Sequence, residues 1–287
     1  SARLGSNEYF IVEADEYDSA FFDKRSKFIH YFPNILAINN IEFDHADIFD
    51  DLTPILKQFS HLLRTIPANG QVVFHENDQT TKHLVDKENW FDVYSIGNDK
   101  QFYYDETKNL FIFNGKEYDL DELPFFGEHN YKNALMAMCL AYLCDVPYEE
   151  SFQALKNYTG VKRRLEVIFQ GNTHLVYDDF AHHPTAIEAV SEAIKSKYAS
   201  KMIGIIELAS NTMKSGRHGN TLIDSTKNFD RIYFLDHENT LNDANSFSSL
   251  EKIIDDLKKV ICDYETIIIM TNKDSQIISR EIIKLCN

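Results

Sequence analysis

Short apolar runs alternate with longer amphipathic segments along this chain of 287 residues. Apolar runs that end in polar side chains are typical of buried strands, and they occur at residues 9–12, 35–38, 71–74, 202–206, 231–235 and 266–270. Segments with apolar residues three or four positions apart predict helices, which begin at residues 53, 184 and 250, with a last helix that ends at residue 285. Strands that alternate with helices predict an α/β fold with mostly parallel sheets.

Two regions and one boundary modify this pattern. Residues 92–120 contain short aromatic runs split by glycine and asparagine, which predicts small antiparallel strands. Residues 129–143 are almost entirely apolar, so we expect a helix that is buried on most sides. A boundary near Gly160, followed by strands at 165–169 and 174–177, divides the chain into domains of residues 1–159 and 160–287.

Composition excludes several classes of function. The chain has 45 acidic and 29 basic residues, a formal net charge of −16, which disfavours nucleic acid and anionic membrane surfaces as partners. Its 44% hydrophobic content is enough for two cores, and no apolar run reaches the length of a membrane span. Cysteines without metal-ligand spacing indicate a reduced, cytoplasmic protein: Cys139, Cys144, Cys262 and Cys286.

Polar side chains follow two of the predicted strands directly. Four carboxylates between Glu13 and Asp18 come after residues 9–12, and the stretch from Asn39 to Asp47, which contains His45, comes after residues 35–38. Ligand crevices in parallel sheets lie at the carboxyl ends of strands, and Mg²⁺ prefers oxygen ligands. Each stretch alone is equally consistent with a solvated acidic turn, but together they favour one shared metal site.

Three further clusters admit two readings each. Asn130 and Asn133 share a helical face, where their amides could pair with a nucleobase or simply cap the helix. Arg164, near the boundary, could hold a phosphate or form a surface ion pair. The string from Asp178 to His183 suggests a metallohydrolase, but adjacent histidines rarely ligate one ion, so we give this hypothesis little weight. No glycine-rich phosphate-binding loop is present in the sequence.

Taken in this order, these strings resemble the Mur ligase family of peptidoglycan amide-forming enzymes. The strings are GEHNYKNALMA, GVKRRLE, YDDFAHHPTAI and the long stretch from Glu13 to Leu52. The long stretch is most similar to the branch that joins a murein tripeptide to UDP-N-acetylmuramate in peptidoglycan recycling. The resemblance implies a truncated central ATPase-like domain followed by a Rossmann-like C-terminal domain.

The resemblance also implies an ATP- and Mg²⁺-dependent reaction through an acyl phosphate, with the following roles. Glu13 and His45 would bind magnesium, and His129, Asn130 and Asn133 would border the adenine. Arg164 and Asp179 would reach ATP from the C-terminal domain, and His182 would join Arg164 near the reaction centre. Ser210, Asn211 and Lys214 would form the pocket for the peptide amine.

Some features depart from the family pattern. The P-loop and the N-terminal domain that holds the UDP-sugar would lie upstream of Ser1, so we expect the fragment alone to be inactive. Ala209 stands where the branch usually has arginine, and residues 272–276 replace a glycine-rich segment. Two alternatives remain: the ligase branch that adds L-alanine, against which residues 21–27 argue, and a non-catalytic remnant that only binds a peptide or partner.

Overall fold

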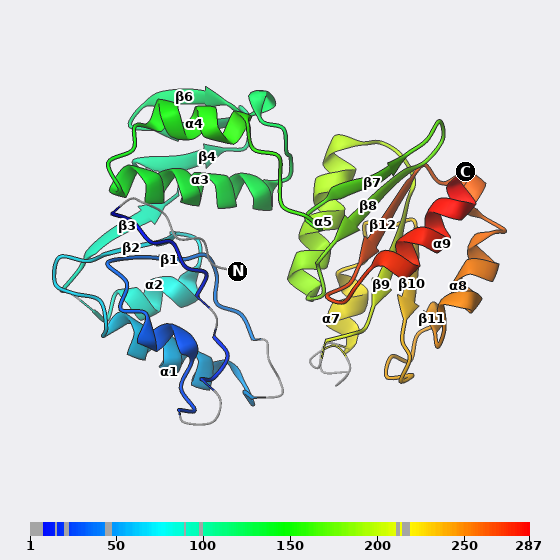
Figure 1. Ribbon diagram of the computed structural model, residues 1–287, viewed down its shortest axis with the longest axis horizontal. Coiled ribbons are helices and arrows are strands. Elements are labelled where there is room, and N and C mark those ends of the chain that lie inside the picture. Colours follow the sequence, from blue (N-terminus) through cyan, green and yellow to red (C-terminus); the bar gives the residue numbers. More distant parts are fainter. Residues whose placement is uncertain are drawn as a thin grey trace. The chain divides into compact units, whose positions relative to one another are not determined.

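In the computed structural model, the described residues form two units, each built around a mixed or parallel β-sheet (Figure 1). The structure describes residues 8–14, 16–19, 23–43, 48–88, 90–97, 100–210, 213 and 219–287. Unit 1 comprises Ser1–Pro124 and Asn130–Tyr158, and unit 2 comprises Phe125–His129 and Thr159–Asn287. None of the helices formed by the described residues is long and apolar enough to cross a membrane.

The sheet of unit 1 follows the chain order. Its strands lie side by side as β1 (Ile35–Ile38), β2 (Gln71–His75), β3 (Asp92–Ile96), β4 (Phe102–Asp105), β5 (Leu110–Phe113) and β6 (Lys116–Asp119). The first four strands are parallel, and β4, β5 and β6 are antiparallel. The prediction of small antiparallel strands is therefore confirmed for β4 to β6, whereas β3 continues the parallel part of the sheet.

Four helices among the described residues complete unit 1: α1 (Leu52–Leu63), α2 (Gln79–Val85), α3 (Glu128–Leu143) and α4 (Tyr148–Lys156). Two short 3₁₀ turns are also present: Lys27–His30 precedes β1, and Leu120–Glu122 lies between β6 and α3. The Asp51 carboxylate accepts the backbone N–H of Thr53 and caps α1. One core joins α1 and α2 to β1 and β2, while aromatic contacts such as Phe113 with Tyr142 join α3 and α4 to β4 to β6.

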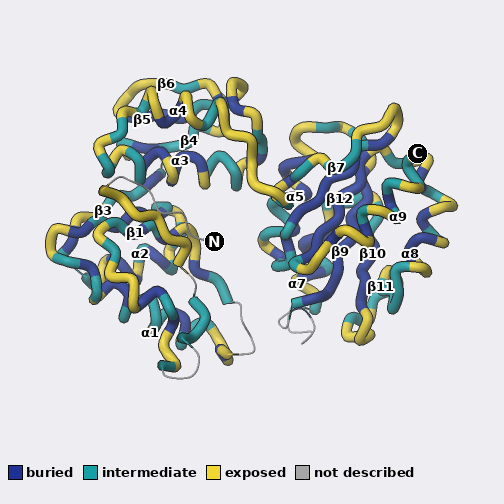
Figure 2. Tube along the Cα trace, in the orientation of Figure 1, coloured by how far each residue is buried: buried dark blue, intermediate teal, exposed yellow. Residues whose placement is uncertain are grey.

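One expectation about burial in unit 1 is wrong, and one is confirmed except along a single stripe. Residues 9–12 form no strand and are exposed, with Ile11 at 93% (Figure 2). An apolar run shows what a segment could bury, but a strand also requires a neighbour to pair with. Helix α3 is buried or half-buried around most of its circumference, with Leu135 and Met138 in the core. Asn133 and Ala137 form an exposed stripe on the side away from these two residues.

The sheet of unit 2 is parallel except at one edge. Its strands lie in the order β11 (Ser246–Phe247), β10 (Arg231–Leu235), β9 (Met202–Glu207), β12 (Thr266–Met270), β8 (Leu175–Asp179) and β7 (Glu166–Gln170), and only β7 is antiparallel to its neighbour. The described helices are α5 (Pro184–Lys197), α7 (Gly219–Asp224), α8 (Leu250–Leu257) and α9 (Gln276–Cys286), with a 3₁₀ turn at Ile261–Asp263. The predicted α/β class and parallel arrangement are confirmed.

Helices cover both faces of the unit 2 sheet because its central strands are apolar on both sides. Successive residues of a strand point to opposite faces, so Ile206 and Ile268 join the core beneath α5 and α7, whereas Ile205 and Ile267 join the core beneath α8 and α9. Figure 2 shows these strands buried between exposed helix surfaces. This is the doubly wound arrangement, in which ligands bind at the carboxyl ends of the strands.

The segment that joins unit 2 to α3 depends on a glycine. Gly127 has φ +96°, and an added Cβ would lie 2.6 Å from the Cβ of Ala193 on α5. Gly115 also has a positive φ, +77°, but an added Cβ there would have no atom within 4 Å. Gly127→Ala therefore combines backbone strain with a steric clash, whereas Gly115→Ala has only the strain.

We expect Gly127→Ala to lower the free energy of unfolding by about 1–3 kcal/mol more than Gly115→Ala does. Denaturant titration of both variants and the wild type measures the difference. Equal losses in the two variants would show that α5 does not pack against this segment.

Candidate functional site

Two adjacent carboxylates end β8 and face opposite sides of the unit 2 sheet. Asp178 accepts the hydroxyl of Ser275 at 2.6 Å and lies 3.3 Å from Nε of Arg163. Asp179 accepts backbone N–H groups from two other segments. The two acids therefore serve separate networks, which agrees with the little weight given to a metallohydrolase.

Asp179 is 2% exposed, and each of its oxygens accepts one backbone N–H. Leu165 donates to Oδ2 at 2.7 Å, and Ala181 donates to Oδ1 at 2.8 Å. Burial raises the pKa of the Asp179 carboxyl, while the two backbone donors and the cation of Arg164 act in the opposite direction. The carboxylate thus ties the segment before β7 to the turn that follows β8.

The segment before β7 has a strained backbone. Arg163 and Leu165 have φ of +60° and +47°, a region that costs residues other than glycine about 1–2 kcal/mol each. Phe180 donates its backbone N–H to the carbonyl of Arg163 at 2.8 Å. The guanidinium groups of Arg163 and Arg164 lie 5.2 and 5.6 Å from the centre of the Phe180 ring. These contacts fix the position of Arg164. The residue itself is exposed to solvent.

His182 lies in the turn between β8 and α5. Its Nδ1 is 2.9 Å from the carbonyl oxygen of Phe180, and its ring packs edge-on against the Phe180 ring with centroids 5.3 Å apart. A carbonyl can only accept, so Nδ1 carries the proton and Nε2 is the basic nitrogen of the neutral ring. The hydrogen bond and the ring contact together fix the orientation of the His182 imidazole.

His129, in the first turn of α3, belongs to unit 2 by its contacts. Burial and, to a smaller extent, the Arg164 cation lower the pKa of His129 to about 4, while Glu128 acts in the opposite direction. His129 is therefore neutral near pH 7. Unit 2 accordingly places His129, Arg164, Asp179 and His182 around the turns at Phe180 and Arg163.

In unit 1, Asn133 belongs to a separate hydrogen-bonded network. Asn39 donates Nδ2–H to Oδ1 of Asn133 at 2.8 Å, and Nε2 of His75 lies 3.2 Å from Oδ1 of Asn39. Asn130, three residues before Asn133 in α3, makes contacts of its own. The sequence analysis missed His75, although a polar residue that ends the apolar strand β2 is the same signal that identified Asn39.

The predicted magnesium ligands are not brought together by the described residues. Glu13 is exposed and outside any helix or strand, and His45 lies outside the described residues. Within the described part of the chain, no three His, Cys, Asp or Glu side chains are close enough to hold a metal ion. The metal site stays a prediction.

The predicted peptide pocket is described only in part. Ser210 accepts the backbone N–H of Met213 at 3.2 Å, whereas Asn211 and Lys214 lie outside the described residues. Ala209 is buried. A cavity of about 260 Å³ adjoins Met213, and it is lined by Leu208, Met213, Gly219, Asn220, Leu222, Ile223, Thr240, Leu241 and Asn242.

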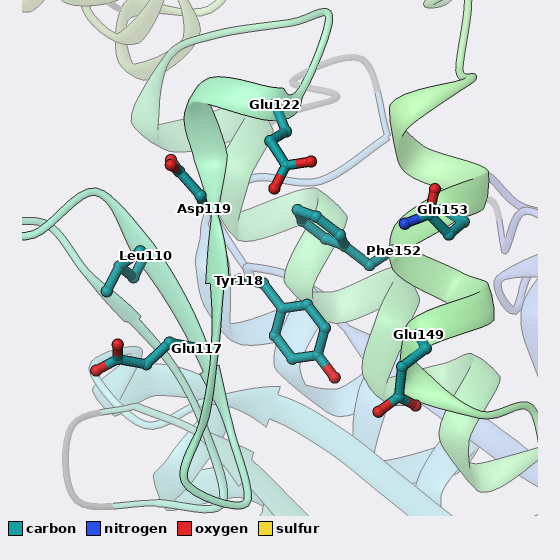
Figure 3. A pocket seen from close by; sticks show the side chains of 8 residues that line it. All are labelled: Leu110, Glu117, Tyr118, Asp119, Glu122, Glu149, Phe152 and Gln153. Carbon is teal, nitrogen blue, oxygen red and sulfur yellow. The ribbon is translucent and has the colours of Figure 1, made fainter.

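A larger cavity, of about 390 Å³, lies between the β5–β6 hairpin and α4 in unit 1. Figure 3 shows Tyr118 and Phe152 facing one another at its centre, with carboxylates around them. Glu149 and Glu122 are already paired with Lys116 and Lys156. None of the predicted site residues lines this cavity.

Comparison with known proteins gives two family matches. The Mur ligase middle domain matches residues 2–141, and the Mur ligase, glutamate ligase domain matches residues 163–280. Together they cover most of the chain. The second match contains Arg164, Asp179 and His182, and the first contains His129, Asn130 and Asn133.

Individual relatives agree with these matches. The UDP-N-acetylmuramate–L-alanyl-γ-D-glutamyl-meso-2,6-diaminoheptandioate ligase of Haemophilus influenzae is 42% identical, over 83% of this chain and 54% of its own length. The UDP-N-acetylmuramate–L-alanine ligase of a Hydrogenobaculum species is 30% identical, over 92% of this chain and 59% of its own. A crystal structure of a murein peptide ligase from Psychrobacter arcticus is 31% identical, with a TM-score of 0.70 over 100% of this chain and 66% of that one. The chain thus spans little more than half the length of these curated relatives.

The lowered pKa of His129 predicts a specific pH dependence of stability. Below about pH 6.5 the unfolded chain protonates this histidine, but the folded protein does not until about pH 4, so stability is lost as the pH falls. We therefore expect His129 to lower the free energy of unfolding by about 2 kcal/mol as the pH falls from 7.5 to 5. Denaturant titrations measure this change. Over the same pH range, the free energy of unfolding of His129→Gln should decrease by about 2 kcal/mol less than that of the wild type. The exposed His83→Gln is the control and should behave like the wild type.

Asp179→Asn should loosen one of the two turns that this side chain holds. The variant keeps the shape but replaces one acceptor oxygen with an N–H₂ group, so either Leu165 or Ala181 loses its acceptor. We expect the amide hydrogen of that residue to exchange about tenfold faster. Asp255→Asn, on the exposed surface of α8, should leave both amides unaffected. Unchanged exchange in Asp179→Asn would mean that other contacts hold the turns.

Proposed function

We propose that this chain, which belongs to the Mur ligase family, is the nucleotide- and peptide-handling part of a ligase that joins the murein tripeptide L-Ala-γ-D-Glu-meso-diaminopimelate to UDP-N-acetylmuramate. The 42% identity to the ligase of Haemophilus influenzae supports the tripeptide. Because this chain spans about half of that relative, the activity, the substrates and the cytoplasmic location are proposals for the complete protein.

The observation that carries this proposal is the turn held by Asp179, which presents Arg164 near His129 and near the Phe180 ring, against which His182 also packs. An arginine whose position is fixed by neighbouring turns is suited to grip phosphate oxygens with two N–H groups. In unit 1, the amides of Asn130 and Asn133 are donors and acceptors of the kind that a nucleobase edge requires. Each of these donor sets has the chemistry that ATP requires. We place the domain limits at residues 1–159 and 160–287.

When bound, ATP supplies the phosphoryl group that converts the acceptor carboxylate to an acyl phosphate, with release of ADP. The amine of the tripeptide then forms the amide bond at that carbonyl, and phosphate leaves. A proton must leave the amine nitrogen in this step. His182 would accept this proton at Nε2, and the hydrogen bond from its Nδ1 to the Phe180 carbonyl supports this role by orienting the ring. Arg164 would stabilise negative charge on the transferring group.

Magnesium would be held by Glu13 and His45, as the resemblance implies, and would neutralise phosphate charge. A carboxylate is a preferred ligand of Mg²⁺, whereas an imidazole is an unusual one, so Glu13 would be the stronger of the two ligands. The peptide amine would enter beside Ser210, Asn211 and Lys214, as the resemblance implies. Of these, Ser210 accepts the backbone N–H of Met213, which lines the cavity of about 260 Å³. Apolar residues of that cavity, such as Leu208 and Leu241, suit the aliphatic part of a diamino acid.

Two other functions would use the same fold. The L-alanine ligase of Hydrogenobaculum is 30% identical, so a ligase for L-alanine is the nearer alternative. A protein that only binds a peptide would share the fold but would not need an oriented His182. Nucleic acid and membrane are not proposed as partners, because the net charge is −16.

A substrate competition on the complete protein tests the proposal. With ATP, Mg²⁺ and UDP-N-acetylmuramate present, we expect kcat/KM for the tripeptide to exceed that for L-alanine by at least about a hundredfold. Phosphate release and mass spectrometry of the product measure both reactions. Preference for L-alanine would overturn the tripeptide assignment, and absence of any product would favour the binding-only alternative.

A variant of Arg164 tests the phosphate grip. Arg164→Ala should lower kcat by about a hundredfold or more in the complete protein, because charge on the transferring phosphoryl loses a fixed partner. Lys162→Ala, at an exposed position two residues away, is the control and should have little effect. Similar activities of the two variants would remove Arg164 from the proposed site.

A further inference from the structure

Three polar side chains meet where β1 and β2 end. The two strands are parallel, and Ile38 is paired with Phe74, so the residues that follow them in register are Asn39 and His75. Nε2 of His75 lies 3.2 Å from Oδ1 of Asn39. Asn39 in turn donates Nδ2–H to Oδ1 of Asn133 on α3 at 2.8 Å. A chain of hydrogen bonds therefore connects the sheet to the helix.

The chemistry of these groups gives this series of hydrogen bonds a single direction from donor to acceptor. A carbonyl oxygen can only accept, so His75 must donate its Nε2–H to Asn39. Burial lowers the pKa of His75, the Lys132 cation adds to this effect, and Asp78 opposes it, so the ring is neutral near pH 7. A neutral imidazole has one N–H, and here it is on Nε2. Asn39 then has its amide N–H₂ toward Asn133.

We propose that His75 is a positioning residue that fixes the Asn133 amide, through Asn39, with its N–H₂ group available to a nucleotide base. Because Oδ1 of Asn133 accepts from Asn39, the group left for a ligand is a donor. A donor pairs with a ring nitrogen of a purine such as adenine. The inference rests on the proposed function, in which Asn133 borders the base of ATP.

Substitutions of His75 separate this role from simple packing. His75→Gln can still donate from its amide to Asn39, so it should rescue the geometry. His75→Leu removes the donor, and the Asn39 amide can then flip, which exchanges the positions of its oxygen and its N–H₂ group. His75→Glu places an acceptor beside Asn39, which would attract N–H₂ and turn Oδ1 toward Asn133. In that case the donor presented by Asn133 would be replaced by an acceptor.

The first measurement is binding of ADP to the complete protein by calorimetry. We expect Kd to rise about 3- to 10-fold in His75→Leu, at least as much in His75→Glu, and less than about threefold in His75→Gln. His83→Leu, at an exposed position in α2, is the matched control and should leave Kd unchanged. Equal Kd values for wild type, His75→Leu and His75→Glu would overturn the inference.

The second measurement does not depend on nucleotide or activity. Side-chain nitrogen NMR of histidine should show His75 as the neutral Nε2–H tautomer near pH 7, and Asn39→Ala should shift its Nε2 resonance. An Nδ1–H tautomer would overturn the inference even if the ligase activity is confirmed. Conversely, absence of ligase activity with the expected tautomer and Kd pattern would refute the proposed reaction but leave the role of His75 standing.

Discussion

Asp179 has almost no contact with solvent, and its two oxygens accept the backbone N–H groups of Leu165 and Ala181. A buried carboxylate is stable only where donors surround it, so the two turns must approach β8 from both sides. Those turns contain Arg164 and His182. The positions of the arginine and the histidine are thus consequences of satisfying one buried charge at the end of a strand.

The two units use the carboxyl edge of a parallel sheet with different chemistry. In unit 2, Asp179 at this edge is buried and accepts backbone N–H groups. In unit 1, Asn39 and Asn133 are exposed, and their order comes from side chains alone. Side-chain amides at an exposed edge can flip and exchange their oxygen and N–H₂ positions. A neighbour such as His75 must therefore set their orientation. Both arrangements follow from parallel strands that end together.

The regular elements were predictable where burial is symmetric or strictly one-sided. Strands β9 and β12 are apolar on both faces and were visible as continuous runs, and α5 was marked by Pro184 at its start. The prediction of a buried strand at residues 9–12 failed because an apolar run does not reveal whether a partner strand exists. The strand β11 has two residues, Ser246 and Phe247, and is too short to produce any periodicity.

The candidate site was predictable in its residue types but not in its connections. Motif order indicated Arg164, Asp179 and His182, yet the donor that holds Asp179 comes from Leu165, fourteen residues earlier. No local pattern reports such a pairing. The sequence did not identify His75 for a related reason: its proposed role depends on Asn39, 36 residues away along the chain. Long-range hydrogen bonds determine these roles, and they depend on strand register.

The backbone near Arg163 bears on the choice between an enzyme and a binding-only protein. Arg163 and Leu165 both have positive φ, and together these conformations cost about 2–4 kcal/mol. Strained backbone persists where surrounding contacts overdetermine it, and it concentrates at functional sites. Here the contacts are those of Asp179 and Phe180, and their shared result is the placement of Arg164. A chain that only bound a peptide at Ser210 would not require that strain, so its retention favours a phosphate-handling role for this turn.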